Sequence, residues 1–331
     1  MLSRCVGFCF FLLFWVANVS ATSGVLDERG RPLPEVVNIF RLLSPLLEPN
    51  REMDAYQTLV EGGSKPLSTE SLLALGATLL KCPKGMETWD PRFIRQFTPY
   101  DTPEIRKLFD EIGFFKKTEP VLTFPVDYLL VFGGVVETLQ ARVQSLGIFY
   151  QQDLFKVNPS TQVLFLGTDR PLNLFETAQL RQVNPRSAVL PKTQLQAFEW
   201  LLEFQPFPKG LQDLNTFCVL KLPGFQKNLP PKDITEHTML VNWLKTRPKP
   251  GHCLILSNQP FVSCHQALLN TVFLKLSRQK WSFEVVGDKP AKRIPLAILV
   301  DTLIRTMELE SLLKGARSKS TPKTKGSKGK I

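Results

Sequence analysis

Small and polar residues directly follow several short apolar runs of this chain. Gly133 and Gly134 follow one such run, and Gly167 and Thr168 follow the next. Glycines let a backbone approach a ligand closely, and the free amides at the start of a following helix attract anions. We therefore expect these residues to cradle an anionic ligand, although a tight turn alone would explain the glycine pair.

Further along the chain, three consecutive hydrogen-bonding side chains follow another apolar run: Ser257, Asn258 and Gln259. Folding does not by itself require them there, so we expect this loop to read the polar groups of the ligand. Arg142 follows the glycine pair by about two helical turns and is expected to pair with the anion, unless it is simply solvated. Thr238, near a predicted helix start, completes the candidate ligand-binding set, although helix capping is an alternative role.

The sequence contains no recognisable catalytic or metal-binding motif. His237 and His265 have no obvious acid partner in the sequence, and no Ser or Cys nucleophile stands in a familiar motif. The cysteine spacing matches no zinc pattern, and the glycine pair is neither a dinucleotide fingerprint nor a phosphate-binding loop with its lysine. Whether the protein is an enzyme therefore stays open, no cofactor is identified, and no metal site is expected.

The apolar runs also predict the elements that position these residues. Short buried strands that alternate with helices are typical of a parallel sheet covered on both faces, which binds ligands at the carboxyl ends of its strands. We expect an α/β fold with a Rossmann-like parallel sheet of about five strands, helices on both faces, and an N-terminal helical layer. The predicted strands lie at 128–132, 162–167, 217–222, 252–258 and 281–287, and the predicted helices at 135–150, 193–204, 235–246, 262–278 and 296–313.

Four regions follow from composition. Residues 1–21 read as a signal peptide with cleavage after Ala21, so the protein is expected to be exported to the periplasm or secreted; an N-terminal anchor in the inner membrane is the alternative. Residues 22–120 form the helical region, in which Thr102 is expected to start a helix. Residues 121–313 form the Rossmann-like domain, and 314–331 are expected to be a disordered tail.

That tail carries seven Lys or Arg residues and no acid, and so holds most of the formal net charge of +11. It is expected either to be simply solvated or to be attracted weakly to anionic surfaces. No aromatic residue lies between its lysines to stack on bases, so no specific nucleic-acid partner is expected.

The order of these motifs over residues 125–290 resembles the YdcF-like family of bacterial envelope proteins, which includes ElyC and SanA. The matching positions are Asp127, Gly133, Arg142, Gly167 and His265. The resemblance implies a Rossmann-like domain in envelope biogenesis, with a small-molecule or lipid-linked substrate. Gln194 stands where the family has an acid, and the family's Arg after the final His is absent.

From these observations we expect an exported protein that binds, and could turn over, an anionic small molecule or lipid-linked envelope precursor at the strand ends. The alternative is a non-enzymatic, degenerate Rossmann scaffold that acts as a secreted interaction protein. The two departures from the family pattern favour that alternative.

Overall fold

The computed structural model describes residues 24–51, 53–61, 66–76, 79–83, 86, 88–121, 125–185, 187, 189–204, 207–214, 217–221, 236–275, 281–290 and 292–320. The predicted signal peptide lies outside these residues, as does the end of the predicted tail. Within the described helices, none combines the length and apolar character that crossing a bilayer requires.

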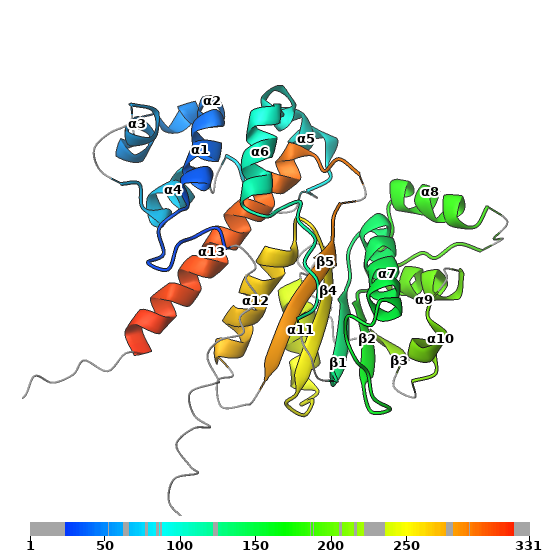
Figure 1. Cartoon of the computed structure of the whole chain (residues 1–331). Helices are drawn as coiled ribbons and strands as arrows, with labels where there is room; N and C mark the ends of the chain where they lie inside the picture. The colour runs from blue at the N-terminus through cyan, green and yellow to red at the C-terminus, as the bar shows by residue number, and fades with distance from the viewer. Residues whose placement is uncertain are drawn as a thin grey trace, which may run out of the picture.

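A parallel sheet forms the centre of the molecule (Figure 1). Strands β2, β1, β4 and β5 lie side by side in that order, and β3 pairs with the outer side of β2. All four pairings are parallel, which confirms the predicted α/β class and its parallel sheet. The strand bounds are β1 Tyr128–Phe132, β2 Gln162–Gly167, β3 Phe217–Lys221, β4 His252–Asn258 and β5 Ser282–Asp288.

Alternate residues of the strands enter two separate hydrophobic clusters, because successive side chains of a strand point to opposite faces. In β1, Leu129 and Val131 pack with the helices on one face, and Leu130 and Phe132 with those on the other. The first face is covered by α7 Val136–Gln151 and α9 Gln194–Phe204, with α8 Leu174–Val183 and α10 Lys209–Gln212 beside them. The second is covered by α11 Glu236–Lys245 and α12 Val262–Lys275.

Helices α7, α9 and α12 begin within one residue of their predicted starts at 135, 193 and 262. The predicted start of α11 at residue 235 lies outside the described residues. Helix α8 was not predicted, although its start carries a recognisable signal. The Asn173 side chain accepts from the Glu176 amide, and the Glu176 carboxylate accepts from the Asn173 amide, which together form a capping box.

An N-terminal helical layer packs on α13 Leu296–Ser320 (Figure 1). Side chains of α13 such as Leu299, Leu303 and Met307 belong to the same buried cluster as Phe40 and Phe109 of the layer. The layer consists of α1 Pro34–Leu42, α2 Ser44–Leu47, η1 Glu48–Asn50, α3 Asp54–Glu61, α4 Thr69–Gly76, α5 Pro91–Phe97, η2 Thr98–Tyr100 and α6 Pro103–Glu111. As predicted, Thr102 caps α6, accepting from the Ile105 amide at 3.4 Å.

The prediction of a disordered tail from residue 314 is wrong for its first part. Helix α13 continues to Ser320, and the Lys314 ammonium donates to the carbonyl of Asp27. The aliphatic stem of Lys314 also lies over Gly30. The composition of the tail does not reveal that Lys314 has a partner in the N-terminal segment, the Asp27 carbonyl.

Candidate functional site

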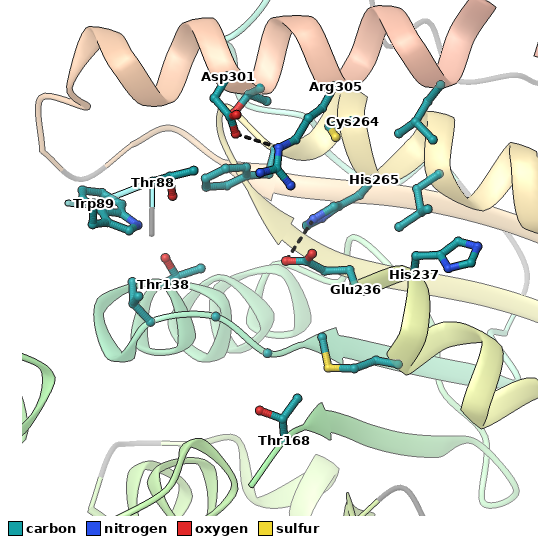
Figure 2. Close-up of a pocket in the computed structure, with 18 of the residues that line it drawn as sticks. Thr88, Trp89, Thr138, Thr168, Glu236, His237, Cys264, His265, Asp301 and Arg305 are labelled. Carbon is teal, nitrogen blue, oxygen red and sulfur yellow. Dashed lines mark hydrogen bonds and ion pairs between the residues drawn. The ribbon is translucent and has the colours of Figure 1, made fainter. Parts of the chain in front are cut away.

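A crevice of about 450 Å³ lies at the carboxyl ends of the strands (Figure 2). The turn after β1, the end of β2 and the first turns of α11 and α12 form its floor and one wall. Helix α13 forms its roof together with Lys81, Met86, Thr88 and Trp89. The chain runs from β1 out to β2 and β3, then crosses to β4 and β5, so the strand order reverses between β1 and β4. Open parallel sheets bind ligands at this switch point.

The glycine pair makes close backbone packing possible at the floor. A Cβ on Gly133 would come within 2.6 Å of Gln194 Oε1 and 3.0 Å of the Leu166 carbonyl oxygen. Gly133 and Gly134 both line the crevice, as expected. Gly167 does not line it, because it packs beneath Leu195 and Phe198 at the start of α9.

The amide of Gln194 joins the ends of two strands. Its oxygen accepts from the Thr168 amide at 2.9 Å, and its nitrogen donates to the Gly134 carbonyl at 2.7 Å. Gln194 is buried, so both bonds are needed to satisfy its polar atoms. An ionised acid at this position could make only the first bond.

Arg142 reaches the strand ends from α7, with only 1 % of its surface exposed. Its Nη1 donates to the carbonyls of Phe132 (2.8 Å) and Gly133 (2.7 Å), and its Nε donates to Asn258 Oδ1 at 3.0 Å. Burial lowers the pKa of Arg142 to about 10, with the nearby charge of Glu236 acting in the opposite direction, so the guanidinium stays charged at neutral pH. Arg142 lines the crevice, but it also ties β1 to β4.

The start of α7 is partly occupied by a carboxylate of the protein itself. The Val136 amide donates to Glu176 Oε1 at 3.3 Å, and the buried Glu176 also pairs with Arg170 at 2.7 Å. The expectation that this helix start cradles a ligand anion is therefore wrong for its first amide, because an internal anion takes that place.

The side chains of the loop expected to contact the ligand contact other parts of the protein instead. None of Ser257, Asn258 and Gln259 lines the crevice. Ser257 is fully buried against His265, Asn258 holds Arg142, and Gln259 Nε2 donates to the Lys116 carbonyl at 2.6 Å. These side chains satisfy backbone and side-chain groups of neighbouring elements, which explains their polarity.

The two candidate threonines differ. Thr168 is buried, lines the crevice and accepts from the Arg170 amide at 3.2 Å. Thr238 does not line the crevice, because the first turn of α11 presents its neighbours Glu236, His237 and Met239 there instead.

A carboxylate, an imidazole and a hydroxyl form a chain that sequence reasoning missed. Glu236 Oε1 lies 3.8 Å from His265 Nε2, and His265 Nδ1 lies 2.8 Å from Ser257 Oγ (Figure 2 shows the first pair). Burial lowers the pKa of His265, and the charge of Arg142 adds to this effect, against the opposing influence of Glu236. Burial alone would raise the pKa of Glu236, but the His265 imidazole and the Arg142 charge outweigh it and lower this pKa to about 2. At neutral pH the pair is therefore a carboxylate beside a neutral imidazole.

The roof adds a second arginine that the sequence did not single out. Arg305 points from α13 into the crevice, and its Nε donates to Asp301 Oδ2 at 2.7 Å (Figure 2). Asp301 also accepts from the Cys82 amide at 2.8 Å, and Lys81 pairs with Glu308 at 2.6 Å. These contacts hold Lys81 and Cys82 against α13. An Asp–Arg pair four residues apart in the mostly apolar first part of this helix was the available sequence signal.

Asp127, one of the positions of the sequence resemblance, lies away from this site. Its carboxylate accepts from the His252 amide at 2.8 Å, at the amino ends of β1 and β4.

Across the described residues there is no cluster of three metal-ligating side chains. The crevice therefore combines cationic, hydroxyl and carboxylate groups, which can hold a polar molecule and exchange protons with it.

Comparison with known proteins adds no assignment. No protein-family model matches the chain, and no curated protein is significantly similar to it.

Proposed function

We propose that the crevice binds a small molecule through an anionic group, a phosphate or a carboxylate. The proposal rests on the arginines that line the crevice: Arg142 and Arg170 on the floor and Arg305 on the roof. Arg170 is already paired with the buried Glu176 at 2.7 Å, which leaves Arg142 and Arg305 as the groups that can receive an anion. In the described part of the chain, no hydrogen bond uses Nη2 of Arg142 or either terminal nitrogen of Arg305. Guanidinium nitrogens are strong donors to such oxyanions.

The two arginines differ in what else they do. Arg142 is held by three bonds, so its remaining nitrogen keeps a defined position before any ligand arrives. The Arg305 side chain is 41 % exposed and is held only through Nε, so it can adjust to the ligand. The Thr138 and Thr168 side chains also line the crevice and offer hydroxyl donors.

The wider role stays a proposal that rests on the sequence. Export and the resemblance to envelope proteins favour an envelope precursor, free or lipid-linked, as the source of the anion. Whether the ligand is turned over is a separate question, which binding measurements do not answer.

Calorimetric titration of the purified protein with inorganic phosphate and with citrate tests the proposal. Arg305→Gln is expected to weaken binding at least about tenfold, in line with the strength of a charged hydrogen bond. Arg293→Gln is the matched control, because Arg293 pairs with Asp101 at 3.1 Å and does not line the crevice.

A second titration, with dodecyl phosphate in micelles, separates a free ligand from a lipid-linked one. Binding of dodecyl phosphate alone would identify a lipid-linked source. If none of the three probes binds, or if Arg305→Gln binds as the wild type does, the proposal is overturned and the scaffold alternative is favoured.

A further inference from the structure

We propose that the ligand carries a hydrogen-bond donor, an ammonium or a hydroxyl, beside its anionic group, and that Glu236 receives this donor. The inference rests on the proposed function and specifies the class of molecule that the crevice takes. It makes Glu236 the residue that selects among anions.

The position of Glu236 carries the inference. Figure 2 shows its carboxylate inside the crevice, with Thr138 on α7, Thr168 at the end of β2 and Arg305 on α13 around it. The side chain is 34 % exposed, so a ligand can reach it. The Glu236 charge raises the pKa of both Arg142 and Arg305, in keeping with its place in the same crevice as these two arginines.

A simple anion fits this arrangement poorly. The Glu236 carboxylate is ionised at neutral pH, so it repels a second negative charge and can only accept hydrogen bonds. A ligand that places a donor against Glu236 and an anion against the arginines turns this repulsion into attraction. The crevice is therefore complementary to a molecule with both groups.

His265 lies beside the Glu236 carboxylate and is itself held in place by two neighbours. The His265 ring packs edge-on against Phe132 at 5.1 Å between centroids, and Ser257 Oγ lies 2.8 Å from its Nδ1. When the hydroxyl donates to Nδ1 of the neutral ring, Nε2 carries the proton and faces Glu236 Oε1 at 3.8 Å. This distance is longer than a hydrogen bond, so the carboxylate remains available to accept from a ligand.

Two matched probes test this, propyl phosphate and 3-aminopropyl phosphate, which share the anion and differ in the ammonium. The wild-type protein is expected to bind 3-aminopropyl phosphate at least tenfold more tightly in calorimetric titration at neutral pH. Glu236→Gln should remove this preference and bind propyl phosphate more tightly than the wild type does. Glu137→Gln, which changes a carboxylate on α7 outside the crevice, should keep the wild-type preference.

The comparison of the two probes on the wild-type protein does not depend on any variant folding. Equal binding of the two probes overturns the role of Glu236 and leaves the anion site intact. A preference that survives in Glu236→Gln also overturns it. If neither probe binds, the proposed function itself fails, and this inference fails with it.

Discussion

At the scale of single residues, the polar groups at the strand ends divide into those that hold the protein together and those that face the crevice. Asn258 and Gln194 bind protein atoms with both ends of their amides. Glu236 and Arg305 reach into the crevice. Arg142 does both, because three of its hydrogen bonds are internal while the side chain still lines the crevice.

Substitution of Arg142 should therefore affect stability before it affects binding. Arg142→Met keeps most of the side-chain length but leaves the Phe132 and Gly133 carbonyls and Asn258 Oδ1 without their donor. Loss of a buried partner costs roughly 1–3 kcal/mol, so for three acceptors we expect a loss of at least about 3 kcal/mol in the free energy of unfolding by urea denaturation. An unchanged urea midpoint would show that the guanidinium does not tie β1 to β4.

Gln194→Glu tests the amide that joins the two turns. The acid can accept from the Thr168 amide but cannot donate to the Gly134 carbonyl when ionised. We expect a loss of about 1–3 kcal/mol in the free energy of unfolding at neutral pH. Gln196→Glu on the same helix is the control, because the exposed Gln196 only accepts, from the Lys192 amide at 2.8 Å. Equal effects of the two variants would contradict the proposed bridge.

The pair Glu236 and His265 predicts a loss of stability in acid. Both bind protons more weakly in the folded protein than in the unfolded chain, so protonation favours unfolding. For His265 the loss begins as the pH falls through its ordinary pKa of 6.5. For Glu236 it follows between the ordinary 4.5 and about 2.

Urea midpoints measured between neutral pH and about pH 5 test the first part of this loss. His265→Gln should reduce the change in midpoint over that range relative to the wild type. A full wild-type pH dependence in His265→Gln would show that another group titrates.

At the scale of elements, α13 connects the parts of the molecule. One side of the helix enters the buried cluster of the helical layer, and Asp301 and Arg305 form the roof of the crevice. Near its end, Glu310 accepts from the amides of Val25 (3.4 Å) and Leu26 (3.0 Å). The position of the N-terminal segment therefore depends on α13.

Glu310→Ala should loosen this segment. Two backbone amides lose their acceptor, so we expect faster tryptic cleavage after Arg29 and a loss of about 1–3 kcal/mol in the free energy of unfolding. Glu308→Ala, two residues earlier on the same helix, breaks the partly exposed pair with Lys81 and should leave tryptic cleavage after Arg29 unchanged. Cleavage at the wild-type rate in Glu310→Ala would contradict the contact.

At the scale of the whole molecule, the helical layer and the sheet share α13 and so cannot be separated at a boundary in the sequence. The layer comes from the first third of the chain, but part of its core comes from the last helix. We expect the molecule to unfold as a unit, since the buried core of the layer is completed by side chains of α13.

A fragment of residues 24–121 tests this directly. Without Leu299, Leu303 and Met307 its apolar side chains face water, so we expect little helical circular dichroism and no cooperative thermal transition. The chain from residue 24 to 331 is the reference and should melt cooperatively. A cooperative transition in the fragment would show that the layer is an independent domain.

The sequence by itself determined the class of fold and the place of the crevice. Buried strands are short apolar runs that end at glycine or polar residues, and these local patterns gave the five strand positions and the starts of α7, α9 and α12. Because parallel strands all end at the same edge, Gly133, Gly134 and Thr168 were correctly expected to meet there. Export, the envelope role and the anionic ligand remain predictions.

Only the tertiary structure decided which polar groups face the crevice. Whether a side chain such as Asn258 or Gln259 is free for a ligand depends on partners far away in the sequence, here Arg142 and the Lys116 carbonyl. In the same way, Glu236 and Arg305 gain their position from the packing of α11 and α13 over the strand ends. Hydrogen bonding and ion pairing act through space, so a local pattern shows that a residue is polar but not which group it serves.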